Sequence, residues 1–592
     1  MIADNQIVYA NAAFKDSQRH GTNRYYVRLV QLLLLLAAVT ALYACNSYFL
    51  NRKLANFSCE FISAQFTSLQ FIGAFELIER PSLNALRETL SGRYPPLYYL
   101  GSAATASFTG KTWWKMNLVH NSFYLLILLV GCYLFASHTG SHESGMLTAA
   151  IAASYAPVCG SFSQFSPDFP LMGLAVFSNY LLLKSGFFES FSWSMVLALV
   201  CAWGMLVKEP FGAFVAGPVV FGLFLSAKKA LRRNTGPIMN FAVFAVVLLL
   251  LISPYYSRVC KSATDNIFYF TLAGAPIGVK IFSLHNLRLI TSGLSENLLS
   301  LSFFAVMLAG LYYFMRNAES KVKYMVLLWI AVPCVMLFSI DHLKSERYLL
   351  PLLPAFAVIS SYWLSRAWRG YWGKTAVMLL IVLGIVQYYD VTYGTVLNLG
   401  NANYAGLYYF KPETEVVPGY DVLRHNSDVL SAIRSSTERA LTALRLRDGK
   451  DRTRVMLVPP PSYVNLASYF WFNGINVAVM QKDLYSDIGK IKKVYSKLDS
   501  IDLLLQTTFN DKQLSFNKPE YFTAIKEEYL SKQGVPAVSK SEMAMYEGMW
   551  KTICATFTEP CEVSRYGDIS VSLYTKKLIK PLTTRQPAAE IQ

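Results

Sequence analysis

The chain is poor in charged residues and lacks the cysteine patterns of metal-binding and redox proteins. Charged residues make up 15% of its 592 positions, against 54% hydrophobic residues. The nine cysteines include no CxxC pair and show no metal-ligand spacing with histidine, which argues against a cysteine-based metal site. There is also no evident internal repeat and no acidic residue in the middle of an apolar segment. Transporters commonly have internal repeats and acidic residues in mid-membrane, so the lack of both argues against a transporter or lipid flippase. That function stays an alternative, together with a non-catalytic envelope scaffold.

The hydrophobic residues are concentrated in blocks that end near residue 390. Beyond that point the sequence has the composition of an ordinary soluble protein. The first block, Val27–Phe49, is long enough at ~1.5 Å per residue to cross a hydrocarbon core ~30 Å thick. It is longer than the apolar core of a signal peptide and starts further from the N-terminus, so we interpret it as a retained anchor. We therefore expect a cytoplasmic N-terminus (1–26), a membrane domain (27–390) and a soluble domain (391–592).

Apolar blocks inside the membrane domain predict a polytopic α-helical membrane protein with about eleven transmembrane helices. After the anchor, the expected crossings are Met116–Ala136, Met146–Gly160, Phe169–Leu183, Phe191–Leu206, Phe211–Ser226, Ile238–Ile252, Leu298–Phe314, Met325–Phe338, Tyr348–Leu364 and Thr375–Tyr388.

Basic residues predict the orientation of these crossings, because cytoplasmic loops are enriched in Lys and Arg. With the basic N-terminus inside, the loops "AKKALRRN", "MRNAESKVK" and "SRAWRGYWGK" all fall inside, and the loop 50–112 and the soluble domain fall outside. A further full crossing at "PPLYYLGSAATASFTG" would reverse the three basic loops, so we expect that segment to be partly inserted or to lie on the surface. The net charge of +17 then serves contacts with anionic lipid head groups and not nucleic acid.

The same orientation collects polar residues from distant parts of the chain at the outer face. The acidic candidates are Glu60, Glu76, Glu79 and Asp168, and the basic candidates are Arg93, Lys208 and Arg347. A carboxylate there can act as general base on a hydroxyl, and Arg or Lys can stabilise charge on a departing phosphate. Charges at membrane boundaries are also common as helix-end anchors, so the prediction depends on their joint placement.

Four motifs carry a resemblance to a known family. In chain order they are "GRYPPLYYL", "SPDFPLMGLAVFSNYLLLKS", "GMLVKEPFG" and "SERYLLPLLPAFAVISSYWL". Their order and spacing resemble the polytopic glycosyltransferases of the GT-C fold, in the protein-O-mannosyltransferase-like branch that includes the lipid A aminoarabinose transferases. The resemblance implies a polyprenyl-phosphate-sugar donor, inversion at the anomeric carbon, and an envelope lipid, glycan or protein hydroxyl as acceptor. It also implies an enzyme in the bacterial plasma membrane whose C-terminal domain is extracytoplasmic.

The resemblance also implies roles for individual residues. The family has a catalytic Asp in its first outer loop, whereas this chain has no Asp between residues 51 and 94. We therefore expect Glu60 to be the base, with Glu76 and Glu79 as reserve acids. Arg93, which precedes the Pro-Pro pair, is expected near the donor phosphate.

Three later residues complete the predicted site. Asp168 matches an outer-face acid that orients the acceptor or the first loop, and Lys208 and Arg347 match basic residues near the lipid phosphate. Asp168 could instead be a helix N-cap, and Arg347 could pair with Glu346 or Asp341. Side-chain cations can serve a phosphate leaving group, so we expect no metal and no cofactor.

The soluble domain is expected to have an α/β fold. The apolar runs "RVMLVPP", "INVAVM", "SIDLLLQT" and "ISVSLYTKK" predict strands, and "SYVNLASYFWF" predicts a helix between them. Cys554 and Cys561 are close enough in sequence for a disulfide if the domain lies in an oxidising compartment, and two unrelated thiols are the alternative.

Overall fold

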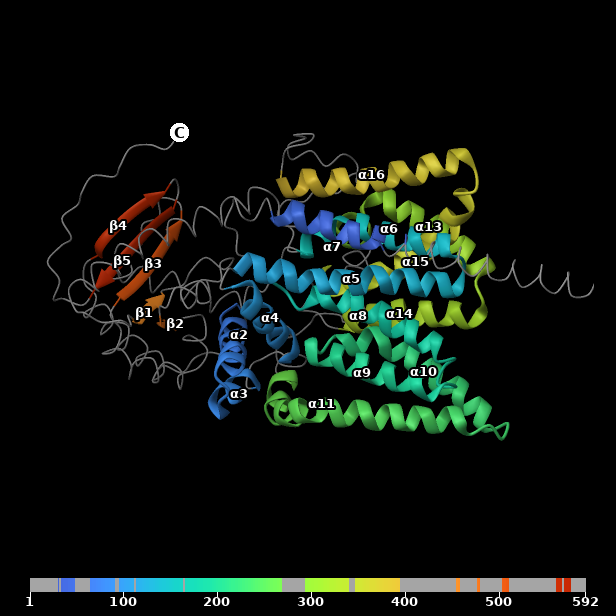
Figure 1. Cartoon of the computed structure of the whole chain (residues 1–592), viewed down its shortest axis with the longest axis horizontal. Coiled ribbons are helices and arrows are strands. Elements are labelled where there is room, and N and C mark those ends of the chain that lie inside the picture. The colour runs from blue at the N-terminus through green and yellow to red at the C-terminus, as the bar shows by residue number, and fades with distance from the viewer. Residues whose placement is uncertain are drawn as a thin grey trace, which may run out of the picture.

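The structure, a computed structural model, consists of a helical bundle and a five-stranded sheet (Figure 1). It describes residues 30, 33–47, 64–90, 95–110, 113–162, 165–268, 293–339 and 346–393 of the bundle, and the strands 454–457, 476–479, 503–509, 560–566 and 569–575.

The segments expected to cross the membrane are helical where the structure describes them, apart from breaks at Tyr155 and Leu299. They correspond to Leu33–Ser47, α5 (Trp113–Thr139), α6 (His142–Ser154) with α7 (Ala156–Phe162), α8 (Asp168–Lys184), α9 (Phe191–Val207), α10 (Phe211–Ala230), α11 (Gly236–Phe268), α13 (Ser300–Asn317), α14 (Ser320–Ser339), η3 (Glu346–Leu352) with α15 (Leu353–Ala367), and α16 (Tyr371–Tyr393). A short π-helix, η2 (Gly293–Leu298), precedes α13.

Apolar length identifies several membrane spans among these helices. Four helical stretches in the described part are long and apolar enough to cross a membrane alone, namely Lys115–Thr139, Phe211–Ala230, Gly236–Ser257 and Arg347–Ala367. The chain is therefore a helical membrane protein with several apolar spans. The figure of about eleven crossings stays a prediction.

The expected crossing 146–160 is broken into two helices. α6 and α7 meet at an angle of 65°, and Tyr155 between them has an extended backbone (φ −69°, ψ 121°). Pro157 lies in the first turn of α7, where the missing N–H costs no helical hydrogen bond. The proline therefore starts a new helix and does not kink a continuous one.

The three basic loops lie at one end of the bundle, here called the basic end. They join α10 to α11, α13 to α14, and α15 to α16 (Figure 1). Arg366 links two of them, because its Nη2 donates to Oδ1 of Asn317 at 2.9 Å. The predicted grouping of the basic loops on one side is therefore confirmed by the fold. α8 begins at the opposite end, which we call the Asp168 end.

Three further helices, α2 (Ala64–Glu79), α3 (Leu83–Leu90) and α4 (Leu97–Thr109), lie at the Asp168 end (Figure 1). α4 corresponds to the segment "PPLYYLGSAATASFTG". Pro96 is its N-cap residue, with φ −79° and ψ −17°, close to the angles of a helical residue. α4 has 13 residues, fewer than the ~20 that a full crossing needs, which agrees with the expected short segment.

Small residues let the helices of the bundle approach each other closely. A Cβ atom added to Gly310 of α13 would lie 2.5 Å from the carbonyl oxygen of Ile359 on α15. One added to Gly384 of α16 would lie 2.4 Å from the carbonyl oxygen of Ser154 on α6. Larger residues at either position would push the backbones apart.

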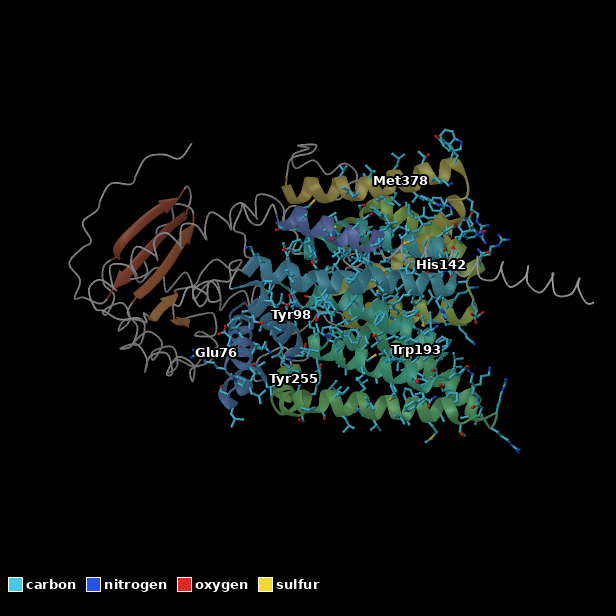
Figure 2. All side chains as sticks on the ribbon, viewed as in Figure 1. Glu76, Tyr98, His142, Trp193, Tyr255 and Met378 are labelled. Atoms are coloured by element: carbon cyan, nitrogen blue, oxygen red, sulfur yellow. The ribbon has the colours of Figure 1, made fainter. Side chains whose placement is uncertain are left out.

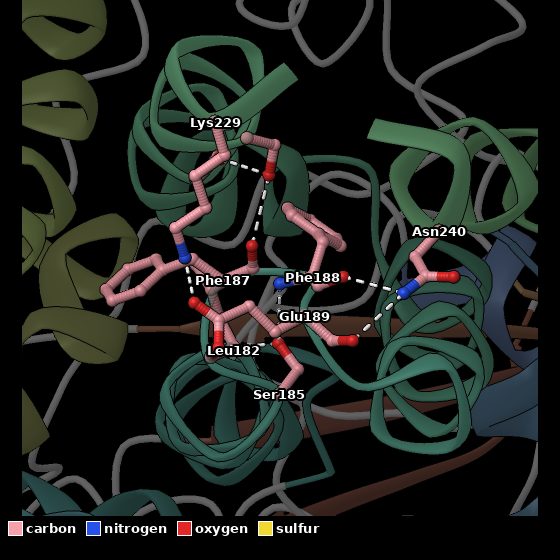
Figure 3. Close-up of polar contacts among 9 residues, drawn as sticks. Leu182, Ser185, Phe187, Phe188, Glu189, Lys229 and Asn240 are labelled. Carbon is pink, nitrogen blue, oxygen red and sulfur yellow. Dashed lines mark hydrogen bonds and ion pairs between the residues drawn. The ribbon is translucent and has the colours of Figure 1, made fainter. Parts of the chain in front are cut away.

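A left-handed turn joins α8 to α9 at the basic end (Figure 3). Gly186, Phe187 and Phe188 have φ angles of 65°, 57° and 72°. The amide of Gly186 donates to the carbonyl of Leu183 and that of Phe187 to the carbonyl of Leu182, which is the Schellman arrangement for ending a helix. Glycine takes the left-handed region without strain, but the two phenylalanines need other support.

Neighbouring helices supply that support. The carbonyl of Phe187 accepts a hydrogen bond from Ser226 of α10 at 3.1 Å, and the carbonyl of Phe188 accepts one from Asn240 of α11 at 2.8 Å. Both rings are buried, and that of Phe188 packs against two phenylalanines of α11. Glu189 pairs with Lys229 of α10. The turn thus joins α8, α10 and α11.

The C-terminal region contains a mixed sheet of order β2-β1-β3-β5-β4. β1 (Arg454–Leu457) pairs in parallel with β2 (Asn476–Val479) and β3 (Leu503–Phe509), and β5 (Ile569–Thr575) is antiparallel to β3 and to β4 (Pro560–Tyr566). The four predicted strands are present. β4 was not predicted; it contains Cys561. The expected helix at 462–472 and Cys554 lie outside the described residues, so the disulfide stays a prediction.

Candidate active site

A buried ion pair lies at the Asp168 end of the bundle. Nζ of Lys208 is 2.9 Å from both carboxylate oxygens of Asp168, and the two side chains are 3% and 4% exposed. The hydroxyl of Ser166 donates to Oδ2 of Asp168 at 3.2 Å and accepts a hydrogen bond from the Asp168 amide at 3.3 Å. These contacts satisfy charges that would otherwise be costly to bury.

Local sequence explains where Asp168 sits. Pro167 occupies the N-cap position of α8, with φ −69°, and makes no side-chain capping bond. Asp168 is the first residue of the helix, where a negative charge interacts favourably with the helix dipole. The N-cap interpretation of Asp168 is therefore wrong: its carboxylate binds Lys208, and the N-cap is a proline.

Lys208 is placed by the end of α9. It is the C-cap residue of that helix, with extended backbone angles (φ −162°, ψ 140°), and its amide donates to the carbonyl of Gly204. The segment Lys208-Glu209-Pro210 then reverses the chain, and the amide of Phe211 donates to the Lys208 carbonyl at 3.2 Å. A positive charge at a helix C-terminus is favoured by the dipole, so both members of the ion pair lie at helix ends that suit them.

Tyr348 brings a third element to the pair. Its ring centroid lies 5.5 Å from Nζ of Lys208 and 5.2 Å from the guanidinium carbon of Arg347, within the range of cation–π attraction. Nη2 of Arg347 also lies 3.4 Å from the Tyr348 hydroxyl. The 3-10 helix η3 thus places one aromatic ring beside two of the predicted phosphate-binding cations.

An aromatic cluster connects α4 to the segment that precedes Asp168. The ring of Tyr98 on α4 lies 5.0 Å from that of Phe165 and 5.1 Å from that of His120 on α5. His120 lies 5.1 Å from Tyr124, whose hydroxyl accepts a hydrogen bond from Trp203 of α9 at 3.3 Å. Tyr98 is fully buried and His120 is nearly so.

The structure brings together three of the predicted site residues. Asp168, Lys208 and Arg347 meet through the ion pair and the ring of Tyr348. The reserve acids Glu76 and Glu79 lie on α2, where both are exposed, and Figure 2 places Glu76 at the same end of the bundle as Tyr98. The remaining two, Glu60 and Arg93, lie outside the described residues, as do the side chains proposed as alternative partners of Arg347.

Metal binding is not indicated in the part of the chain that the structure describes. No group of three or more His, Cys, Asp or Glu side chains lies close enough there to hold an ion. The charge next to Asp168 is supplied by Lys208, and further positive charge nearby comes from Arg347. These side chains enable the site to stabilise an anion electrostatically.

Sequence reasoning missed Tyr348 and Phe165 as parts of this arrangement. Tyr348 adjoins Arg347 in the "SERYLLP" motif, so its aromatic ring next to a predicted cation was a usable signal. Phe165 gave no comparable signal, because an aromatic residue in an apolar chain is most often core. Its contact with α4 depends on packing between segments that are distant in sequence.

The fold of the chain is similar to that of solved structures. ArnT from Cupriavidus metallidurans in the apo state superposes with a TM-score of 0.55 at 13% identity, covering 91% of this chain and 97% of that one. The same protein bound to undecaprenyl phosphate gives a TM-score of 0.54 at 12% identity, covering 93% of this chain and 99% of that one. At these identities the likeness establishes the fold alone. No curated protein sequence matches the chain.

Residues 93–258 match the family described as dolichyl-phosphate-mannose-protein mannosyltransferase. The matched segment begins at Arg93 and includes both Asp168 and Lys208. This segment resembles the GT-C glycosyltransferases of this family. The resemblance inferred from the motifs is thereby confirmed, as is the enzyme class, a glycosyltransferase with a lipid-phosphate-linked sugar as donor.

Proposed function

We propose that the protein transfers a sugar from a polyprenyl-phosphate carrier to a hydroxyl group of an envelope lipid, glycan or protein, with inversion at the anomeric carbon. A carrier of the undecaprenyl-phosphate type is supported by the fold shared with ArnT, which has been captured with undecaprenyl phosphate. The family match supports a monophosphate-linked donor.

In this proposal the Asp168 end faces away from the cytoplasm. The support is the gathering of the three basic loops at the opposite end, since Lys and Arg are enriched in cytoplasmic loops. The sugar is then transferred at the outer face of the plasma membrane, on the same side as the C-terminal domain.

The donor phosphate is proposed to bind near Lys208 and Arg347, with Arg93 completing the set. A phosphate leaves as an anion, and fixed cations stabilise the charge that develops on it. The single observation that carries the proposal is the buried Asp168–Lys208 pair beside Tyr348 and Arg347. Asp168 balances the charge of Lys208 in this buried pair, so Arg347 beside the Tyr348 ring supplies the net positive charge for the phosphate.

Asp168 is proposed as a positioning residue, because its carboxylate is engaged by Lys208 and Ser166. The general base is then a different carboxylate, for which Glu60 in the first outer loop is the candidate. It would take the proton of the acceptor hydroxyl as the oxygen attacks the anomeric carbon. The bond from that carbon to the phosphate oxygen breaks, and polyprenyl phosphate leaves.

The test uses the full chain in lipid nanodiscs. Undecaprenyl-phosphate-linked mannose and aminoarabinose are supplied as donors, and release of undecaprenyl phosphate is followed by mass spectrometry. Envelope lipids and glycoproteins from cells with and without the protein are compared in parallel to identify the acceptor. A sugar-modified product whose anomeric configuration is opposite to that of the donor supports the proposal; retained configuration contradicts the stereochemistry. Donor-independent appearance of the product contradicts the function.

A further inference from the structure

The contact between α4 and α5 leaves no room for a side chain at Gly101 unless His120 or a helix moves. A Cβ atom at Gly101 of α4 would lie 2.6 Å from Cε1 of His120 and 3.5 Å from its two ring nitrogens. Real Cβ atoms essentially never approach another heavy atom to 2.6 Å. The imidazole of His120 therefore points its Cε1 edge at α4, at the position where that helix has no side chain.

The imidazole is held in place by its surroundings. The rings of Tyr98 and Tyr124 lie 5.1 Å away, on α4 and α5 respectively, and Nδ1 of His120 lies 3.5 Å from the hydroxyl oxygen of Thr105, one turn along α4. That hydroxyl donates to the carbonyl of Gly101 at 2.9 Å. These neighbours surround the ring on the sides of both α4 and α5.

The same contact reaches the ion pair through two rings. Tyr98, three residues before Gly101, packs against Phe165 at 5.0 Å. Phe165 immediately precedes Ser166, whose hydroxyl binds the Asp168 carboxylate. A displacement of α4 along its contact with His120 would therefore move Tyr98 and, through Phe165, the segment that holds Asp168 against Lys208.

We propose that the packing contact between Gly101 and His120 sets the position of α4, and that the two act as positioning residues for the Asp168–Lys208 pair. The ring of His120 sets how closely α4 approaches α5, and the absence of a side chain at Gly101 permits that approach. The role of His120 is steric, so a ring of similar size can replace it. This inference relies on the proposed function for its activity measurement only.

The experiment is a compensation test with four variants. Gly101→Ala adds a methyl group that collides with His120, and the expected loss in kcat/KM is on the order of 10²-fold, as for a displacement of about 1 Å near a reaction centre. Gly101→Ala/His120→Ala removes the obstructing ring and recovers most of that loss. Gly101→Ala/His120→Phe keeps a ring and does not recover it. His120→Phe alone stays close to wild type. Gly236→Ala is the control, because its added Cβ meets only Asn234 Oδ1, at 3.6 Å.

A distance measurement keeps the test independent of catalysis. Spin-labelled noncanonical amino acids at Phe108 of α4 and Leu250 of α11, both exposed, report the position of α4 relative to the bundle. Gly101→Ala should shift the distance distribution, and the double variant with His120→Ala should restore it. If Gly101→Ala fails to fold, the same double variant should restore expression.

Several outcomes overturn the proposal. An unchanged label distance and activity in Gly101→Ala contradicts it, as does a double variant no better than the single one. A His120→Phe variant as impaired as Gly101→Ala would mean that the imidazole acts chemically. If no variant and no wild-type sample transfers sugar while the distances shift and recover as expected, the proposed function fails. The role of the Gly101–His120 contact in positioning α4 is then still supported.

Discussion

Asp168 and Lys208 are 40 residues apart in the chain, yet Nζ of Lys208 lies 2.9 Å from both carboxylate oxygens of Asp168. Both side chains are almost fully buried. The pair joins the first residue of α8 to the residue that ends α9. Ser166 and Tyr348 complete its surroundings. Most of what we expect of this protein depends on that relationship.

Removing one member of the pair should destabilise the protein more than its contact alone is worth. Asp168→Asn and Lys208→Met should each lower the free energy of unfolding by about 3–5 kcal/mol, because each leaves the partner buried without its counter-charge. The double variant should lose much less than the sum. Chemical denaturation in detergent measures this, and additive losses would contradict it.

The exposed Glu189–Lys229 pair at the basic end is the matched control for that experiment. Its side chains are 54% and 31% exposed, and solvent screens their attraction. Replacing either one should change the free energy of unfolding by only about 0–1 kcal/mol. An equal effect of the two pairs would mean that burial does not set the cost.

Glu60→Gln should abolish sugar transfer while leaving expression and folding intact, because the amide cannot accept the proton of the acceptor hydroxyl. General-base catalysis typically contributes ~10²–10⁴-fold, and single-turnover assays resolve such a loss. Glu143→Gln serves as the control, since Glu143 lies exposed in the first turn of α6 and has no expected role in the reaction. Full activity in Glu60→Gln would move the base to Glu76 or Glu79, and full activity in all three would remove first-loop base catalysis.

Arg93→Ala and Lys208→Ala should weaken use of the lipid-phosphate donor. Loss of one electrostatic contact to a charge that forms in the transition state typically costs ~10²–10³-fold, and a donor titration separates this loss from acceptor effects. Arg369→Ala, in the loop between α15 and α16 at the basic end, should be neutral. Neutral behaviour of the first two variants would argue that this end does not face phosphate.

Tyr348 tests the role of the ring between the two cations. Tyr348→Phe keeps the ring and should retain most activity and stability. Tyr348→Leu removes the cation–π contacts with Lys208 and Arg347, a loss of about 0.5–2 kcal/mol in the free energy of unfolding. If Tyr348→Phe lost as much stability as Tyr348→Leu, the hydroxyl and not the ring would matter.

The turn at the basic end should depend on Asn240. Its Nδ2 donates to the carbonyls of Phe188 and Glu189 at 2.8 and 3.2 Å, and these bonds support a left-handed backbone. Asn240→Ala should lower the free energy of unfolding by about 1–3 kcal/mol. Met239→Ala, at an exposed neighbouring position, should change it little, and an equal change in both would refute the role of the hydrogen bonds.

Much of the bundle could be predicted because each helix is specified locally. Backbone groups in a bilayer must bond within their own segment, so an apolar run of sufficient length becomes a helix. The enrichment of Lys and Arg in cytoplasmic loops grouped the basic loops at one end, and from that grouping the segment of α4 was expected not to cross. The break at Tyr155 was harder to predict, because Pro157 marks it only approximately.

The site was predictable in part. Asp168, Lys208 and Arg347 were expected at one face from orientation alone, and they do meet. The specific partners were not predictable: a Ser-Pro-Asp sequence looks like a capping signal, and nothing local indicates that the carboxylate turns to a lysine on the next helix. Glu60 and Arg93 remain predictions of the family resemblance.

By itself, then, the sequence determined the helical membrane class, the positions of the helices, the grouping of the basic loops and the glycosyltransferase resemblance, since these follow from composition, run length and short motifs. Only the tertiary structure decided that Asp168 binds Lys208 beside Tyr348, and that His120 packs against Gly101. Such contacts depend on the rotation and tilt of each helix, which are set by packing among residues that are distant in the chain.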